Sequence, residues 1–306
     1  MSSTTALLDK CVKRGTKLSG RQAYLADSNP INFHCWVISR FEDKDRFERS
    51  KHILTELKMD PIRFVGVEGR KTPRLPAYSK LSDGEWGCLL SHQSIWMLAA
   101  RHPNENQYTA VFEDDIVTPL MGNALLEQFD RLQQVLVKRR NTDLVFLGKC
   151  HEYCQILTHV SDNVYEANRP MCLHSYLIHN KFARQLMLKP ILQKSLLEAS
   201  NAYNLNHPAF ENLAVDAGLV KLINSKQCNA LVYHPALFFQ DVLQTSSNLR
   251  NRKEQFGMYS ECQELLDHNN ARHGLFAAGL VVFTIVLCYI FYLYRNIRSN
   301  NRNNED

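Results

Sequence analysis

With 306 residues, 45% of them hydrophobic and 22% charged, the chain has the composition of a globular protein. This length allows one domain of about 220 to 250 residues or two smaller ones. The net charge is only +5 at pH 7 and no long run of Lys or Arg occurs, which argues against a nucleic-acid-binding protein.

The expected domain covers residues 31–250, in which strand-like and helix-like segments alternate up to residue 148 and the second half is less regular. The first expected strand covers 33–39, an amphipathic helix follows over 43–59, and a second strand covers 62–67. A strand, a helix and a strand in this order form a βαβ unit, whose right-handed crossover makes the strands parallel. The fold class is therefore α/β. Further helices are expected over 81–100, 123–139, 182–188 and 211–222, and further strands over 109–112, 143–148, 171–178 and 230–233.

Three consecutive acids, Glu113, Asp114 and Asp115, follow the expected strand 109–112. A buried strand cannot hold three adjacent carboxylates cheaply, because each would be desolvated beside like charges. The acids fit better at the carboxyl end of the strand, where open α/β sheets bind their ligands. Mg²⁺ and Mn²⁺ take carboxylate oxygens together with substrate phosphates. The acids therefore predict a metal that holds a diphosphate, and the alternative is a solvated acidic turn.

The nine cysteines are odd in number and scattered through apolar segments, which predicts reduced thiols and no disulfide framework. Cys150 and Cys154 form the one tight cluster. Together with His159 and His174 they could form a zinc site, although the loose spacing favours a plain loop.

A transmembrane helix is expected over 274–294, which is 21 residues without a charge. As a helix this segment would be about 31 Å long, enough to cross a bilayer. Residues 1–30 are expected to be a loosely attached arm, 251–273 a juxtamembrane linker and 295–306 a polar tail.

Two rules disagree on the topology of this single-pass membrane protein. The Lys/Arg bias near the span favours a cytoplasmic tail. A span close to the end of the chain, with no upstream signal, favours a cytosolic domain, and this second argument is preferred. Consistent with it, no Asn is followed two residues later by Ser or Thr.

The run from Leu81 to His92, with Trp96 four residues later, resembles the Leu-Ser-x-Gly-Glu-x-Gly-Cys-x-x-Ser-His motif of glycosyltransferase family 25. Within this run, Glu85 on its own reads as the partner of Ser82 in a helix capping box. The family includes lipooligosaccharide sugar transferases and the galactosyltransferase domains of collagen-modifying enzymes.

Other segments extend the resemblance over residues 33–250. The acidic stretch 111–115 is similar to the metal motif of the family, and 37–39 with Arg46 resembles its first-strand signature. There, Ser39 and Arg40 stand where the family usually has Asn and Leu. The segments 175–178, 214–216 and 235–240 with 246–247 resemble later motifs, although the Pro expected before Val215 is missing.

This resemblance implies a GT-A fold, a Rossmann-type domain of two joined halves that bind a nucleotide sugar and the acceptor. It implies a metal-dependent, inverting transferase that moves a hexose, with galactose from UDP-galactose expected, to a hydroxyl of a glycan, glycolipid or protein. The bound metal, Mn²⁺ or Mg²⁺, would neutralise the departing diphosphate as a Lewis acid.

The resemblance also implies roles for single residues. Asp115 is the expected direct metal ligand, Glu113 would act through water or contact the ribose, and Asp114 would help or orient the other two. Asp216 is the candidate general base for the acceptor hydroxyl, the alternative being a helix-surface acid. The residues expected to shape the donor pocket are Ser39, Arg46, Ser82, Gly84, Glu85 and His92.

Two other functions are compatible with the sequence. One is a catalytically inactive, membrane-tethered relative that binds a sugar nucleotide or a partner. The replaced Ser39 and Arg40 favour it, and the intact acids oppose it. The other is hydrolysis of the donor at the same metal site, which would form product without an acceptor.

Overall fold

The computed structural model describes residues 33–187, 207–241 and 261–262. The expected arm, the expected transmembrane segment 274–294 and the polar tail lie outside these residues. Among the described helices, none has the length and apolar character needed to cross a membrane.

An eight-stranded mixed sheet forms the centre of the domain, in the order β2-β1-β3-β8-β5-β9-β7-β6. The parallel pairs are β1 with β2, β1 with β3, and β5 with β9. Strand β8 is antiparallel to both β3 and β5, so a wholly parallel sheet is the wrong description. The strands are β1 Phe33–Ser39, β2 Pro61–Val65, β3 Tyr108–Glu113, β5 Leu144–Phe146, β6 Thr158–Ser161, β7 Val164–Glu166, β8 Ser175–His179 and β9 Ala230–Tyr233.

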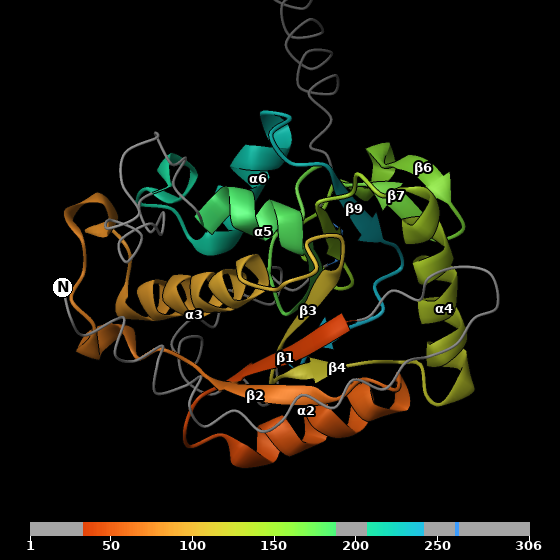
Figure 1. The fold of residues 1–306 in the computed structure, drawn as a ribbon, viewed down its shortest axis with the longest axis horizontal. Helices are drawn as coiled ribbons and strands as arrows, with labels where there is room; N and C mark the ends of the chain where they lie inside the picture. Colours follow the sequence, from red (N-terminus) through yellow and green to blue (C-terminus); the bar gives the residue numbers. More distant parts are fainter. Residues whose placement is uncertain (1–32, 188–206, 242–260, 263–306) are drawn as a thin grey trace, which may run out of the picture. The chain divides into compact units, whose positions relative to one another are not determined.

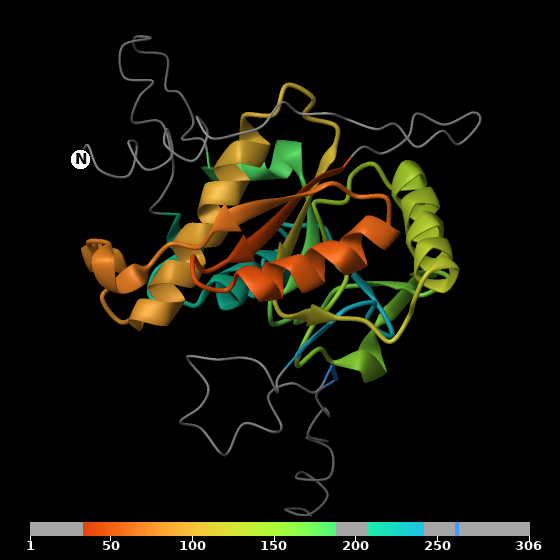
Figure 2. The same cartoon turned by 90° about the horizontal axis from the view of Figure 1, so that it is seen from below.

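Helices cover both faces of this sheet, as the α/β prediction requires (Figure 1 and Figure 2). On one face α3, α5 and α6 pack over one hydrophobic core, and on the other α2 and α4 pack over a second. The helices are α2 Lys44–Glu56, α3 Asp83–Ala100, α4 Asn123–Lys138, α5 Asn180–Met187 and α6 Val215–Asn224, and the short 3-10 helices are η1 Gly69–Lys71, η2 Pro76–Tyr78, η3 Cys154–Ile156 and η5 Pro208–Phe210.

Helix α3 is buried along most of its length, which fixes its side chains against the sheet. Its first turn lies backbone to backbone against η1: a Cβ on Gly87 would come within 2.5 Å of the Val67 carbonyl oxygen and 2.9 Å of the Gly69 nitrogen. No side chain fits there, so glycine is required at this close approach.

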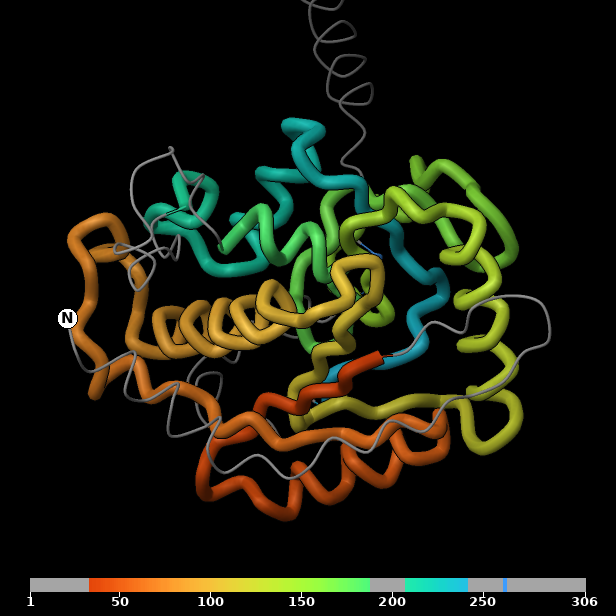
Figure 3. Tube along the Cα trace, viewed as in Figure 1, coloured from red at the N-terminus to blue at the C-terminus, as the bar shows by residue number. Residues whose placement is uncertain are grey.

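A second, two-stranded sheet joins β4 (Ile116–Val117) to β10 (Phe239–Gln240) in antiparallel fashion. The Cα trace in Figure 3 follows the chain as it returns from β9 toward this pair. Just beyond β10, the Asp241 nitrogen donates to the Asp115 carbonyl oxygen at 2.7 Å. The C-terminal part of the domain thus holds the turn that carries the acids.

The prediction of reduced thiols is wrong for four cysteines. Cys150 is bonded to Cys172, and Cys154 is bonded to Cys262, 108 residues further along the chain. The two cysteines of the expected zinc cluster therefore belong to different disulfides, which removes the zinc alternative in this state. The other described cysteines are free thiols, as expected: Cys35, Cys88 and Cys228.

Glu261 and Cys262 pack on the domain, although they fall in the stretch expected to be a linker. The Glu261 carboxylate accepts a hydrogen bond from the buried Lys149 ammonium at 2.5 Å and another from the Ala236 nitrogen at 2.9 Å. His234 Nδ1 lies 2.5 Å from the same oxygen. Burial lowers the pKa of Lys149, while the Glu261 charge opposes that shift. Because Lys149 is fully buried, this ion pair belongs to the core.

Candidate active site

Strand β3 is an inner strand of the sheet, and the acids lie at its carboxyl-terminal end. Side chains alternate along a strand, so Glu113 lies on the same face as Val111, the face covered by α3. Asp114 and Asp115 follow in the turn between β3 and β4, and both are buried, at 7% and 8% exposure. The expectation that the acids lie at the carboxyl end of this strand is confirmed.

Arg46, on the first turn of α2, binds both aspartates. Its Nη2 lies 2.8 Å from Asp114 Oδ1 and 3.3 Å from Asp115 Oδ2. The remaining oxygens, Asp114 Oδ2 and Asp115 Oδ1, are buried and have no hydrogen-bond partner among the described residues. The Arg46 guanidinium therefore leaves one oxygen of each aspartate without a partner among the described residues. Burying an unpaired carboxylate oxygen is unfavourable in free energy.

The three acids differ in pKa. Burial, followed by the negative charges of Glu113 and Asp114, raises the pKa of Asp115 to about 8, although the positive charge of Arg46 opposes the shift. Burial also raises the pKa of Asp114, while the nearby Ser39 hydroxyl and the Arg46 charge oppose that shift. A buried carboxylate with a raised pKa is often found at a functional site. The cluster lacks positive charge and would gain from a further cation.

Glu113 behaves differently because polar groups surround it. Burial by itself would raise its pKa, but the hydrogen bond from His92 and the electrostatic interactions with His92, His174 and Arg46 outweigh burial and hold the pKa below its ordinary value. His92 Nε2 lies 3.4 Å from Glu113 Oε1, and Gln240 Nε2 donates to Glu113 Oε2 at 3.2 Å. Glu113 is therefore held as a carboxylate between α3 and β10.

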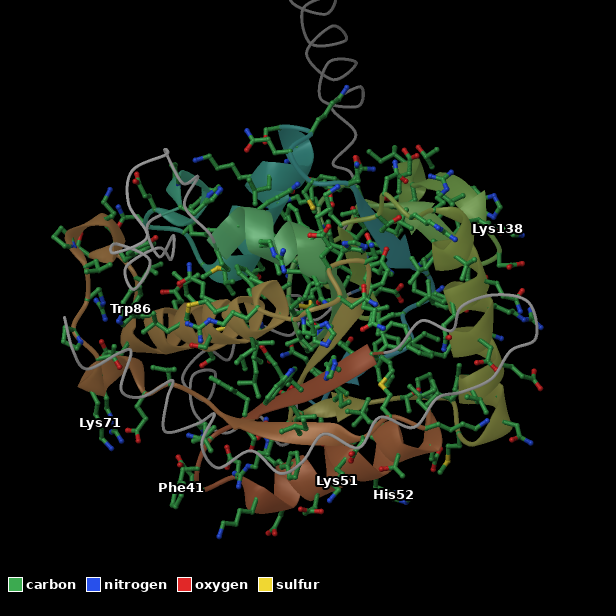
Figure 4. All side chains as sticks on the ribbon, in the orientation of Figure 1. Phe41, Lys51, His52, Lys71, Trp86 and Lys138 are labelled. Atoms are coloured by element: carbon green, nitrogen blue, oxygen red, sulfur yellow. A yellow bond between two sulfur atoms is a disulfide. The ribbon has the colours of Figure 1, made fainter. Side chains whose placement is uncertain are left out.

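Ser39 lies at the end of β1, beside the acidic turn. Its hydroxyl donates to the Asp43 carbonyl oxygen at 3.1 Å and accepts from Arg63 Nη2 at 3.2 Å. The same Arg63 nitrogen donates to the carbonyl oxygens of Arg40 and Phe41. The loop after β1 is thus fixed, and the Phe41 ring projects into solvent with 69% exposure (Figure 4).

The sequence motif at the start of α3 forms the expected capping box. Ser82 Oγ accepts from the Glu85 nitrogen at 3.2 Å, and Glu85 Oε2 accepts from the Ser82 nitrogen at 2.8 Å. Gly84 lies between them and is half-buried. Ser82 and Glu85 therefore bind each other, and their expected part in the donor pocket stays a prediction.

Asp216 lies on the first turn of α6, where both of its carboxylate oxygens accept backbone hydrogen bonds. Oδ2 accepts from the Cys172 nitrogen at 3.0 Å, and Oδ1 accepts from the Ala217 nitrogen at 2.7 Å. Cys172 has a positive φ of 64° and is held by its disulfide to Cys150. This contact fixes the carboxylate through the loop before β8.

Cys88 lies one turn before His92 on α3, and the pKa of its thiol responds to acids from several elements. Burial raises the pKa of its thiol, and the negative charges of four carboxylates raise it further. These carboxylates belong to Glu113, Asp216, Glu85 and Asp115. Acids from β3, its following turn, α3 and α6 therefore all lie close enough to Cys88 to affect its thiol.

Comparison with known proteins identifies the family. Residues 34–191, just over half of the chain, match glycosyltransferase family 25, described as an LPS biosynthesis protein family. The chain belongs to glycosyltransferase family 25. A procollagen galactosyltransferase 1-B from Xenopus laevis is 28% identical over 130 residues, which cover 37% of this chain and 21% of the relative. The match thus spans about a fifth of the length of that curated relative.

Membership confirms the family expected from the sequence, and a glycosyltransferase family implies a nucleotide-sugar donor and an acceptor. The mixed α/β domain agrees with the GT-A fold. The acidic turn and α3 lie inside the matched residues, whereas Asp216 and Gln240 lie beyond them. Assignments in the second half of this glycosyltransferase therefore rest on its own geometry.

The residues of the acidic turn fit a divalent cation. The donor set consists of hard carboxylate oxygens, two of which are buried and unpartnered among the described residues. Asp115 and Asp114 already bind a guanidinium, which shows that the turn accommodates positive charge. Asp115 would hold the ion through its unpartnered Oδ1, and Glu113, the second expected ligand, has its two oxygens beside His92 and Gln240.

Several groups at the site escaped the sequence reading. Gln240 and the His174 carbonyl oxygen, which accepts from the Glu113 nitrogen at 2.9 Å, both come from later segments that pair with the acidic stretch. Tyr176 and Trp96 were noted only as parts of motifs, yet both bind behind His92. The sequence offered one signal for this contact, namely Trp96, an aromatic residue with an N–H donor one helical turn after His92.

Proposed function

We propose that this family-25 glycosyltransferase is metal-dependent and inverting, and that it transfers galactose from UDP-galactose to a hydroxyl of a glycan, glycolipid or protein. One observation carries the proposal: Asp114 and Asp115 are buried at the end of β3, and each keeps an unsatisfied oxygen among the described residues. The ionised form of such a turn is stabilised by additional positive charge, which a bound metal would supply beside a diphosphate.

The donor would bind across the ends of β1 and β3. Asp115 and Glu113 would hold the cation, which as a Lewis acid would stabilise the charge on the departing diphosphate. Arg46 supplies a second positive charge to the same turn and would donate to a phosphate oxygen. Ser39 and Arg63 fix the loop after β1 against which the nucleoside would lie.

Asp216 is the proposed general base. Its two oxygens accept backbone hydrogen bonds, so the carboxylate is oriented before substrate arrives, and each oxygen keeps a lone pair for the acceptor hydroxyl. The acceptor oxygen would attack the sugar C1 as its proton passes to Asp216, and the bond from C1 to the diphosphate would break. Correct placement of these atoms is the main contribution of the protein.

We further propose that residues 274–294 anchor the protein as a transmembrane helix. The two disulfides change the argument on topology, because disulfides persist in oxidising compartments and are rare in the cytosol. We therefore favour a catalytic domain on the oxidising side, opposite to the cytosolic placement expected from the sequence.

Transfer by the full chain in detergent tests the catalytic proposal. The protein would be incubated with Mn²⁺, a panel of labelled UDP-sugars, and procollagen peptides or lipopolysaccharide core as acceptors. We expect transfer from UDP-galactose by the wild type and at least about a 100-fold loss in Asp115→Ala. Glu48→Gln, an exposed acid on α2, serves as the control. Unchanged turnover in Asp115→Ala would remove the metal assignment, and release of sugar without acceptor would indicate hydrolysis.

A further inference from the structure

Three buried side chains connect α3 and β8 to the back of Glu113. Trp96 Nε1 donates to the Tyr176 hydroxyl at 2.8 Å, and that hydroxyl lies 2.9 Å from His92 Nδ1. His92 Nε2 then lies 3.4 Å from Glu113 Oε1. Trp96, Tyr176 and His92 are all fully buried, at 0% exposure.

The chemistry of the two ends determines the direction of these hydrogen bonds. An indole N–H can only donate, so the Tyr176 oxygen accepts from Trp96 and keeps its own proton to give. A carboxylate can only accept, so His92 Nε2 must carry a proton to bind Glu113. In the neutral imidazole Nδ1 is then an acceptor, and it receives the Tyr176 proton. Both ends require the same tautomer of His92, with the proton on Nε2.

The opposite tautomer would leave polar groups unsatisfied. With the proton on Nδ1, the Tyr176 oxygen would accept from both Trp96 and His92, and no other acceptor for its hydroxyl is found among the described residues. Nε2 would then face the Glu113 carboxylate without a proton between them. A buried group without a partner is costly, so the network selects one arrangement.

Cys88 lies close to His92 and Glu113 but does not take part in these hydrogen bonds among the described residues. Its sulfur lies within 4.8 Å of ligand atoms on His92 and Glu113, which gives the geometry of a three-residue metal group. Burial and the surrounding carboxylates raise the pKa of this thiol well above its ordinary value. In the metal-free state these effects favour the protonated thiol over the thiolate, which is the form that binds metals.

We propose that Tyr176 and Trp96 are positioning residues, which fix His92 with its proton on Nε2 and so hold the Glu113 carboxylate in its working orientation. The inference rests on the proposed role of Glu113 at the metal and donor site. Gln240 holds Oε2 of this carboxylate, and the His92 relay holds Oε1, so loss of the relay leaves Glu113 tethered by its side chain on one oxygen only. Partners behind a ligand commonly change metal affinity or activity by about 10-fold to 100-fold.

Tyr176→Phe tests the relay, and Tyr108→Phe is the matched control. Tyr108 is also buried, and its hydroxyl donates to the Thr142 carbonyl oxygen at 2.9 Å, from the opposite end of β3 to Glu113. Each variant removes one buried phenol hydroxyl, so both should lower Tm comparably. We expect only Tyr176→Phe to reduce kcat and the affinity for Mn²⁺ measured by calorimetry, each by about 10-fold or more. Equal effects of the two variants would overturn the inference.

A second measurement reads the tautomer directly. The full chain, labelled with ¹⁵N only in histidine, would be examined by NMR at pH 8.5, and His92→Gln would assign the His92 signals. We expect the Nε2-protonated form in wild type and a mixture of tautomers in Tyr176→Phe. A wild-type His92 protonated on Nδ1 would refute the relay.

The two failures can be told apart. If Asp115→Ala abolishes transfer while Tyr176→Phe keeps wild-type kcat and Mn²⁺ affinity, the positioning role is wrong and the proposed function stands. If the wild type transfers no sugar, the proposed function fails, and the tautomer together with the Mn²⁺ affinity of Tyr176→Phe still decides whether the relay positions Glu113.

Discussion

Arg46 Nη2 lies 2.8 Å from Asp114 Oδ1, in a buried contact that joins the first turn of α2 to the turn after β3. The same nitrogen is 3.3 Å from Asp115 Oδ2. The resemblance implied that Arg46 helps to shape the donor pocket, and the structure places its guanidinium on the two aspartates. A guanidinium in this position partly neutralises the turn and also stands beside the proposed diphosphate site.

Arg46→Ala should weaken donor binding and destabilise the domain. Its loss leaves two buried carboxylates without their partner, which costs about 3 to 5 kcal/mol for a buried pair. We expect a lower Tm and a higher KM for the nucleotide sugar, measured by thermal unfolding and initial rates. Lys51→Ala, on the exposed side of α2, should leave both unchanged. Wild-type behaviour of Arg46→Ala would contradict its placement on the acids.

Asp115 should make the metal-free protein less stable as pH rises. The pKa of Asp115 is about 8 in the folded state, above its ordinary value of 3.8, so the folded state binds the proton more tightly. Stability from this group is complete below about pH 4 and is lost as pH rises toward 8, at about 1.4 kcal/mol per pH unit at most. Asp115→Asn should lose this dependence.

The measurement is the Tm of both proteins in EDTA at pH 5 and pH 9. All other titrating groups are shared, so the difference in Tm between Asp115→Asn and wild type isolates Asp115. We expect this difference to grow in favour of the variant between the two pH values. A difference that stays constant with pH would mean that Asp115 is not held in a charge-poor environment.

The long elements of the fold could be predicted because their sequence patterns are strong. Strand β1 matches the expected range 33–39 completely, and α3 and α4 agree within about two residues at either end. The short strands β4 and β10 escaped prediction, because two residues carry no periodicity and become a strand only by pairing with each other. The antiparallel direction of β8 likewise depends on the path of the chain.

The site was predictable where a motif marked it. His92 and Glu113 were both expected at the site and lie 3.4 Å apart, and Asp115 follows Glu113 in the turn after β3. Cys154 gave no sign of its disulfide to Cys262, since a pairing over 108 residues follows from the tertiary fold and not from spacing. Gln240 was missed for the same reason.

Asp216→Asn should reduce kcat with little change in KM for the donor. The amide keeps the shape of the side chain but cannot take a proton, and removal of a general base typically costs about 10²-fold to 10⁴-fold in rate. Steady-state transfer with UDP-galactose measures it. The control is Asp143→Asn, an acid at the start of β5 whose Oδ2 accepts from the Asn229 nitrogen. A kcat within twofold of wild type would exclude Asp216 as the base.

Glu261→Gln should destabilise the domain although Glu261 lies near its C-terminal end. Lys149 is fully buried, so its ammonium would lose the one carboxylate that binds it among the described residues. Breaking a buried ion pair costs about 3 to 5 kcal/mol. Glu105→Gln breaks the exposed pair with Arg184 and should cost less than about 1 kcal/mol. Urea unfolding compares the two, and equal small losses would show that residue 261 does not belong to the folded core.

The disulfides and the proposed anchor lead to one prediction about topology. If Cys150–Cys172 and Cys154–Cys262 form in the cell, the domain lies in an oxidising compartment and intact vesicles should protect it from protease. Peptide mapping without reductant should recover both pairs, and removal of residues 274–306 should release the domain from the membrane fraction. A domain digested in intact vesicles, with all cysteines reduced, would instead place it in the cytosol, as the sequence alone suggested.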